Sequence, residues 1–286
     1  MLPFRTILFP VDYTASCRAM VPYVRDMTAH FSAQLTLLHA YGAGASTDSG
    51  SGLYDPNWPE RVRAYEKNRI EEFAQTQFPD LRADALVHEG EPAAVIHNMV
   101  EHQGADLVML PTHGAGPIRR MLIGSITAKV LHDVSGAVWT VAEPVLTARS
   151  SMLPCKSIVC AVDEGEESEA VVRAAAFLAS SFGAQLFLIR GVATPPQAAE
   201  VDFSALRRQL LDAADKNLRD LKVRLGVDAP HKVTDHSIIE AVHEEVLQTK
   251  AGLVVVGRGR AQKGFTRIWS LLYPIVREAS CPVLSI

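Results

Sequence analysis

An internal repeat constrains the fold of this chain more than any other feature of its sequence. Three pairs of segments match in the same order: Thr6–Asp12 with Ser157–Asp163, Phe31–Leu38 with Phe182–Ile189, and Ala105–Leu110 with Ala251–Val256. Matching segments in a constant order are typical of a duplicated structural unit. The sequence therefore predicts two domains of the same fold in one chain.

Composition agrees with two globular domains. The 286 residues are 48% hydrophobic and 21% charged, which excludes a disordered chain or a disulfide-stapled miniprotein. Each half is also close to the commonest domain size. We expect the domains at 1–148 and 149–286, because Glu143–Pro154 carries the linker residues Pro144, Ser150 and Ser151.

Charge and cysteine usage limit the partners and the compartment. Lys and Arg number 28 against 32 Asp and Glu, for a net charge of −4. No overall positive field therefore exists for nucleic acid or an anionic membrane. The N-terminal apolar run meets Pro10 and Asp12 too early for a signal peptide. The four cysteines form no C-x-x-C pair, and we expect a cytoplasmic protein with core thiols.

Short apolar runs alternate with helix-length segments in the first half. The expected strands are Thr6–Val11, Leu35–Ala40, Ala85–His88, Leu107–Leu110 and Val138–Val141, and the expected helices include Ala15–Phe31, Glu60–Phe78 and Pro92–His102. Apolar strands with intervening helices predict a doubly wound α/β domain, in which a parallel sheet has helices on both faces. The repeat predicts this domain twice. Ligands of such sheets bind beyond the carboxyl ends of the strands.

A glycine-containing stretch follows the fourth expected strand. It runs from Pro111 through Gly114 and Gly116 to Gly124-Ser125, which opens a helix. Glycines allow a ligand to approach the backbone, and a helix start offers free amides and a positive dipole end to phosphate oxygens. The alternative is a simple turn at Gly116, with Ser125 as an ordinary N-cap.

Three motifs together resemble the universal stress protein family, and the resemblance covers nearly the whole chain. They are Pro10-Val11-Asp12, Thr112-His113-Gly114 with Gly116, and Gly124-Ser125-Ile126. The resemblance implies a five-stranded parallel sheet like that of adenine-nucleotide alpha-hydrolases, and dimerisation through the last strand. In one branch it also implies ATP held by a Gly-x2-Gly-x9-Gly-Ser/Thr motif. Pro111 stands where that motif has its first glycine.

Carried over to this chain, the resemblance implies a nucleotide site in the first half. Pro10 and Ala40 would border adenine, and Asp12 would face the ribose or a phosphate-bound Mg²⁺. The full set of expected contacts is Pro10, Val11, Asp12, Ala40, Pro111, Thr112, His113, Gly114, Gly124, Ser125 and Ile126.

Several of these residues also have simpler explanations. Asp12 could instead cap the helix that starts near Ala15, and His113 could make only a structural hydrogen bond. Arg119 and Arg120 could reach a γ-phosphate or form a solvated pair. The segment Gly42–Gly52 could fold over a nucleotide as a lid or be an inert loop.

The second half keeps the repeated strand segments but lacks much of the nucleotide motif. Asp163 is retained, but Trp269 stands where a phosphate-contacting glycine is expected. An indole would obstruct close approach to the backbone. Arg258, Arg260 and Lys263 form a basic loop that could hold another anion or be solvated. We expect weak or no ATP binding here, and a structural role as partner of the first half.

These expectations converge on an ATP-binding, nucleotide-dependent stress-response switch with slow or no hydrolysis, since no residue stands out as a general base. Its partners would be Mg²⁺-bound adenine nucleotide, an unknown client protein, and a second copy or the second half as a pseudo-dimer mate. The alternative is a nucleotide-free scaffold of the same fold, and a third hypothesis is a phosphotransferase. The sequence contains no P-loop, H-E-x-x-H or G-x-S-x-G motif.

Overall fold

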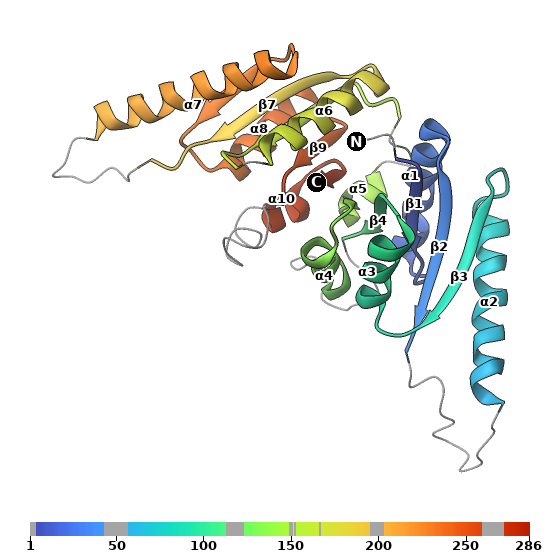
Figure 1. Cartoon of the computed structure of the whole chain (residues 1–286). Helices are drawn as coiled ribbons and strands as arrows, with labels where there is room; N and C mark the ends of the chain where they lie inside the picture. Colours follow the sequence, from blue (N-terminus) through green and yellow to red (C-terminus); the bar gives the residue numbers. More distant parts are fainter. Residues whose placement is uncertain are drawn as a thin grey trace. The chain divides into compact units, whose positions relative to one another are not determined.

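The computed structural model describes residues 4–42, 57–112, 123–148, 151, 153–165, 167–194, 203–258 and 272–286. The chain divides into two compact units, Pro3–Met152 and Leu153–Ile286. Each unit is an α/β domain built on a parallel sheet (Figure 1). The doubly wound fold predicted for both halves is therefore confirmed.

The first unit has five parallel strands in the order β3-β2-β1-β4-β5. They are β1 (Thr6–Pro10), β2 (Gln34–Tyr41), β3 (Ala83–Glu89), β4 (Leu107–Pro111) and β5 (Ala137–Val141). The helices are α1 (Ala15–Phe31), α2 (Trp58–Gln77), α3 (Pro92–Gln103), α4 (Ser125–Asp133) and α5 (Glu143–Ala148). The strand order reverses between β1 and β4, which is where a doubly wound sheet forms its ligand crevice.

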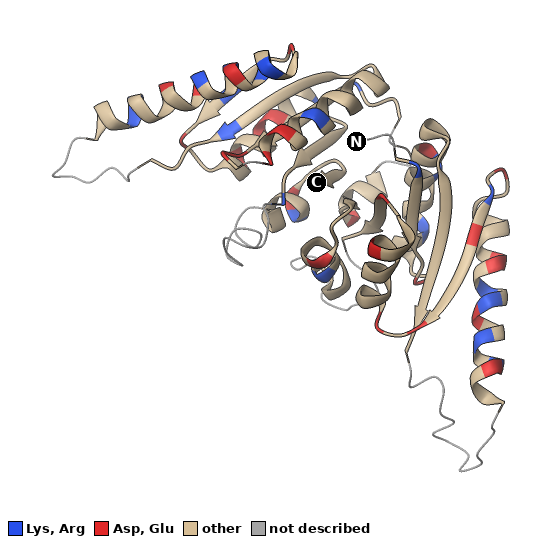
Figure 2. Cartoon of the chain, viewed as in Figure 1, with Lys and Arg blue, Asp and Glu red and all other residues tan. Residues whose placement is uncertain are grey.

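Helices cover both faces of this sheet, with α2 and α3 on opposite sides of the strands (Figure 1). The apolar side of α1 buries Met20, Val24 and Met27, while the guanidinium of Arg18 lies 5.7 Å from the ring centroid of Phe73 on α2. Positively and negatively charged residues are interspersed along α2 (Figure 2). The amphipathic patterns predicted these helices because one face of each is buried and the other is solvated.

The second unit repeats the arrangement in the order β10-β9-β6-β7-β8, again with parallel pairings. Its strands are β6 (Ser157–Val162), β7 (Gln185–Gly191), β8 (His231–Thr234), β9 (Leu253–Val256) and β10 (Val283–Ser285). Its helices are α6 (Ser168–Phe182), α7 (Ser204–Leu225), α8 (Ile238–Thr249) and α10 (Tyr273–Glu278).

The segment expected as a linker begins with structure of its own. α5 occupies Glu143–Ala148 and buries Val145 and Leu146, so two apolar side chains secure this segment to the first unit. All four cysteines are free and buried, as core thiols should be. Among the described residues, no helix is both long and apolar enough to cross a bilayer.

Candidate functional site

A cavity of about 370 Å³ lies at the carboxyl ends of β1, β2 and β4, next to the starts of α3 and α4. We call it the β1–β4 cavity. Its lining residues are Pro10, Val11, Asp12, Leu38, His39, Ala40, Pro92, Ile96, Leu110, Pro111, Gly124, Ser125, Ile126 and Thr127. Apolar walls with a few polar groups suit a flat heteroaromatic ring joined to a polar portion.

The β1–β4 cavity brings together most of the residues expected around a nucleotide. Eight of them line it: Pro10, Val11, Asp12, Ala40, Pro111, Gly124, Ser125 and Ile126. Thr112 is fully buried and is not part of the lining. His113, Gly114, Arg119 and Arg120 lie outside the described residues, as does 43–52 of the expected lid.

Asp12 is exposed at the rim of the β1–β4 cavity and does not cap α1. The N-cap is Thr14, whose hydroxyl oxygen accepts a hydrogen bond from the Cys17 amide at 3.1 Å. Asp12 Oδ1 in turn accepts from the Thr14 amide at 3.0 Å and from the Thr14 hydroxyl at 2.6 Å. The alternative role of Asp12 as the N-cap is therefore wrong, and its carboxylate is anchored at the site by the true cap.

The start of α4 differs in two ways from expectation. The N-cap is Gly124 rather than Ser125, which is exposed. The Gly124 amide also donates to the Thr112 carbonyl at 2.8 Å, so this amide is already engaged. As the first amides of the helix, those of Ser125, Ile126 and Thr127 have no acceptor within it and can receive an anion.

Sequence reasoning missed His39, which also lines the β1–β4 cavity. Its Nδ1 donates to the Val11 carbonyl at 2.7 Å, and its ring lies beside that of Tyr13, with centroids 4.8 Å apart. Burial raises the pKa of Tyr13 to about 12, so its hydroxyl stays protonated at neutral pH. A lone histidine within an apolar strand gave no local signal of these contacts.

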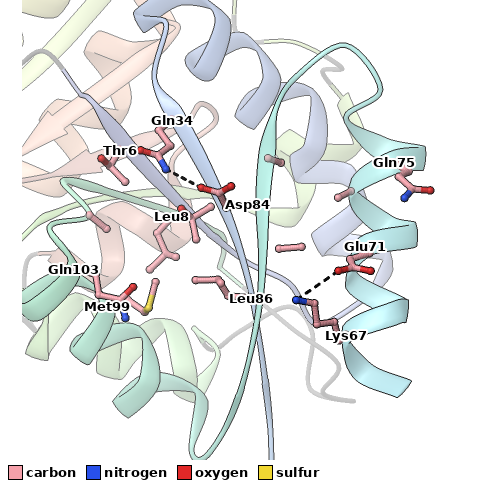
Figure 3. A pocket seen from close by; sticks show the side chains of 15 residues that line it. Thr6, Leu8, Gln34, Lys67, Glu71, Gln75, Asp84, Leu86, Met99 and Gln103 are labelled. Carbon is pink, nitrogen blue, oxygen red and sulfur yellow. Dashed lines mark hydrogen bonds and ion pairs between the residues drawn. The ribbon is translucent and has the colours of Figure 1, made fainter. Parts of the chain in front are cut away.

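A larger groove of about 560 Å³ lies near the amino ends of the strands (Figure 3). Its lining includes Thr6 and Gln34, the first residues of β1 and β2. Gln34 donates to Asp84 at 2.7 Å, and Lys67 pairs with Glu71 at 3.6 Å, so these polar groups already have partners. Parallel sheets bind ligands at their carboxyl ends, and the β1–β4 cavity is therefore the candidate functional site.

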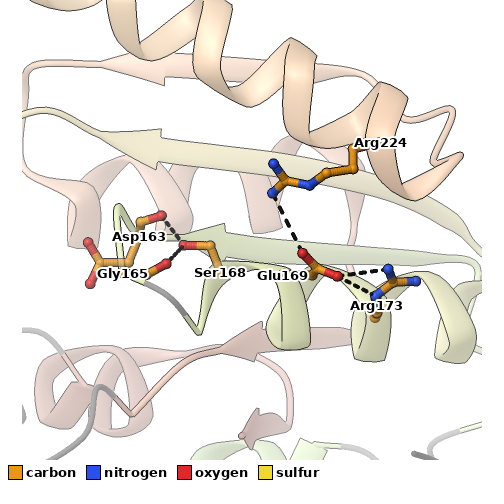
Figure 4. Close-up of polar contacts among 6 residues, drawn as sticks. All are labelled: Asp163, Gly165, Ser168, Glu169, Arg173 and Arg224. Carbon is orange, nitrogen blue, oxygen red and sulfur yellow. Dashed lines mark hydrogen bonds and ion pairs between the residues drawn. The ribbon is translucent and has the colours of Figure 1, made fainter.

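The loop after β6 in the second unit has a different construction (Figure 4). α6 begins at Ser168, so the loop after Asp163 is longer than the loop between Asp12 and α1. The Ser168 hydroxyl donates to the carbonyls of Asp163 and Gly165. Asp163 Oδ1 accepts from the amide of the next residue, Glu164, at 2.6 Å.

A second difference between the units lies at the repeat position of Ala40, which lines the β1–β4 cavity in the first unit. Gly191 stands at the position of Ala40 in the repeat, and a Cβ placed on it would lie 3.0 Å from Ile238 Cβ. The side chain of Ile238 therefore packs closely against the Gly191 backbone in the second unit. Trp269, Arg260 and Lys263 lie outside the described residues. The close approach of Ile238 to Gly191 is a contact that the sequence did not reveal.

Arg258 is the described member of the predicted basic loop. Burial lowers its pKa to about 10, while the Glu167 carboxylate acts in the opposite direction. The guanidinium is therefore still charged at neutral pH.

A family model described as the universal stress protein family matches residues 3–142 and 154–286. A curated Thermus aquaticus protein, named universal stress protein in QAH/OAS sulfhydrylase 3′ region, is 29% identical over 130 residues, which cover 46% of this chain and 93% of its own. A solved universal stress protein from Archaeoglobus fulgidus has a TM-score of 0.69 at 15% identity, covering 99% of this chain and 96% of that chain. A functionally unknown protein from Pseudomonas aeruginosa has a TM-score of 0.62 at 13% identity, covering 99% and 92%. The two structures share the fold of this chain.

Proposed function

Since the chain belongs to the universal stress protein family, we propose that its first unit binds ATP with Mg²⁺ in the β1–β4 cavity. Binding, rather than turnover, is the proposed activity. The second unit is proposed as a partner that has lost the site. The observation that carries this proposal is the convergence of Pro10, Asp12 and Ala40 with the start of α4 around one cavity.

The chemistry of the lining fits an adenine nucleotide. Leu38, Ile96 and Leu110 supply apolar walls for a base, and the volume lies within the usual range for small-molecule sites. The Asp12 carboxylate can accept hydrogen bonds from ribose hydroxyls. The amides at the start of α4 suit phosphate oxygens, because the helix dipole favours negative charge there.

Mg²⁺ would accompany the phosphates rather than occupy a site made by the protein alone. The described residues contain no group of three His, Cys, Asp or Glu that could hold a metal ion. Mg²⁺ in nucleotide sites is commonly held by one or two carboxylates together with phosphate oxygens. Asp12 is the carboxylate of the described lining that could serve in this way.

The described lining also explains why we propose binding without rapid hydrolysis. Its ionisable side chains are Asp12 and His39. Thr14 engages Asp12 Oδ1, and the Val11 carbonyl engages His39 Nδ1. A general base must reach the proton that it abstracts, and we propose slow or no hydrolysis because each of these two groups already makes a contact within the protein.

A nucleotide-dependent switch follows from where the phosphates would lie. They would supply acceptors to the first amides of α4 and so stabilise one arrangement of this end of the unit. A ligand shifts a conformational equilibrium only through such differential contacts. The switched surface would be read by a client protein or a second copy of the chain.

The proposal is tested by mass spectrometry of small molecules released when freshly purified protein is denatured, followed by ATP titration. The Gly124→Trp variant places an indole in the lining of the β1–β4 cavity. As a matched control, Gly165→Trp makes the same change at an exposed glycine of the second unit.

We expect adenine nucleotide in the wild-type protein, loss of binding in Gly124→Trp and normal binding in Gly165→Trp. If no nucleotide is released and ATP does not titrate, the switch proposal fails and the nucleotide-free scaffold becomes the better hypothesis.

A further inference from the structure

The residue after Asp12 has an unusual backbone conformation. Tyr13 has φ = 60°, in the left-handed region. Residues other than glycine seldom adopt this conformation, and they keep it only where the surrounding structure holds them. What holds Tyr13 therefore also influences where Asp12 points.

Three side chains from β2 and α2 surround the ring of Tyr13. The ring centroids of His39 and Phe73 lie 4.8 Å and 5.7 Å away, and the guanidinium of Arg69 lies 3.8 Å from the Tyr13 centroid. The buried Tyr13 hydroxyl has no hydrogen-bond partner among the described residues. In the described part of the chain, the ring contacts rather than the hydroxyl hold this side chain.

The residue before Asp12 is held by the same cluster. His39 Nδ1 lies 2.7 Å from the Val11 carbonyl, and because a carbonyl only accepts, Nδ1 must carry the proton. Glu66 on α2 lies 3.4 Å from His39 Nε2 and 3.6 Å from Arg69 Nη1. One carboxylate oxygen thus lies within ion-pair distance of two of the three side chains that contact Tyr13.

We propose that His39, Glu66 and Arg69 are positioning residues that aim Asp12 at the ribose of the bound nucleotide. They act on Asp12 from both sides, through the Val11 carbonyl and the Tyr13 ring. Thr14 engages Oδ1 of Asp12, which leaves Oδ2 to accept from a ribose hydroxyl. Residues of α2 would thereby influence how strongly the site prefers a nucleotide with ribose hydroxyls. This inference rests on the proposed nucleotide binding.

The second unit has a different pair at the corresponding positions of the repeat. Glu164 and Arg190 stand where Tyr13 and His39 stand in the first unit, and they form an ion pair with a distance of 2.5 Å. The Arg190 side chain is only 6% exposed. The aromatic packing around Tyr13 is therefore a feature of the first unit and accompanies its cavity, as a positioning role requires.

The test compares binding of ATP and 2′,3′-dideoxy-ATP to the full chain, because the second nucleotide lacks the hydroxyls that Asp12 would read. The wild-type protein should prefer ATP by about tenfold, the effect of one charged hydrogen bond at a cavity rim. Arg69→Met keeps the aliphatic packing and removes the guanidinium, and Tyr13→Gly removes the ring where glycine adopts the backbone conformation easily. Both variants should reduce the preference to about twofold and leave dideoxy-ATP binding unchanged.

Two controls separate positioning from a general effect on the fold. Tyr13→Phe keeps the ring and should keep the wild-type preference. Lys67→Met removes one positive charge from the same helix at a residue that pairs with Glu71, and it should also keep the preference. Arg69→Lys should restore part of what Arg69→Met loses, because the ammonium can still pair with Glu66.

Each remaining outcome overturns the inference. If Arg69→Met and Tyr13→Gly keep the wild-type preference, α2 does not position Asp12, although nucleotide binding stands. If these variants weaken both nucleotides equally, the cluster has only a structural role. A wild-type protein that binds ATP without preferring it shows that Asp12 does not read the ribose, and one that binds neither nucleotide contradicts the proposed function itself.

Discussion

The charge of Asp12 can be tested separately from its hydrogen bonds to Thr14. In Asp12→Asn, the amide oxygen can still accept from the Thr14 amide and hydroxyl, so the melting temperature should stay within about 2 °C of wild type. ATP affinity should fall about tenfold, because the neutral amide accepts a weaker hydrogen bond from a ribose hydroxyl and coordinates Mg²⁺ less well than the carboxylate. Isothermal titration calorimetry measures the affinity.

The matched control is Asp163→Asn, the same change at the corresponding residue of the second unit. It should leave ATP binding unaltered. An equal loss in both variants would mean that the two halves share the binding, contrary to the proposed division between them.

Buried thiols predict how stability depends on pH. Burial raises the pKa of Cys17 and of Cys160 from 9.0 to about 12. Above pH 9 the unfolded chain releases these protons while the folded chain keeps them. The contribution of these protonated thiols to the stability of the folded state is therefore complete below about pH 9. It is lost as the pH rises toward 12.

The free energy of unfolding should accordingly fall between about pH 8 and about pH 10.5, and the fall should be smaller in Cys160→Ala. Urea titrations of the wild-type protein and of Cys160→Ala at the two pH values measure this fall in the free energy of unfolding. Rapid labelling of the native thiols at about pH 8 would contradict the burial on which this prediction depends.

At the scale of elements, α1 and α4 begin in different ways. Mutations in their first turns should therefore affect stability and ATP binding differently. Thr14 is a true N-cap, and Thr14→Ala should cost about 1 kcal/mol of stability. Ser125 caps nothing, so Ser125→Ala should change stability by less than about 0.5 kcal/mol while weakening ATP binding through its lost hydroxyl. Chemical denaturation and ATP titration of both variants provide the comparison.

The reverse pattern, in which Ser125→Ala destabilises the fold and leaves ATP affinity intact, would return Ser125 to the capping role. It would also remove the hydroxyl from the proposed phosphate site.

Sequence patterns predicted the elements better than the details at their ends. The α1 bounds agree fully with the prediction, and the first-half strands differ by one or two residues at their ends. The apolar period and the turn residues determine these features locally. The linker prediction missed α5, because a six-residue helix with two buried side chains has too few turns to show a period.

Short motifs predicted which residues lie together at one cavity, but they did not predict the contacts that tertiary packing determines. Pro10, Asp12 and Gly124 were predicted from short motifs, and the structure brings them to one cavity. The contacts of His39 and the approach of Ile238 to Gly191 depend on tertiary packing. Such contacts join residues distant in the chain, and local periodicity does not encode them.

At the scale of the whole molecule, one fold occurs twice, and the two units differ at the carboxyl ends of their sheets. Ile238 packs against Gly191, and Ser168 closes the loop after Asp163 onto itself. These are two separate changes at the carboxyl ends of the second sheet. Reversing either one alone should therefore not restore nucleotide binding.

The two units are expected to differ in nucleotide binding, and the number of nucleotides bound per chain distinguishes a single site from two. Calorimetric titration of ATP with Mg²⁺ into nucleotide-free full-length protein measures this number. We expect one nucleotide per chain, and none in Gly124→Trp. Two nucleotides per chain, or one that persists in Gly124→Trp, would contradict this expectation.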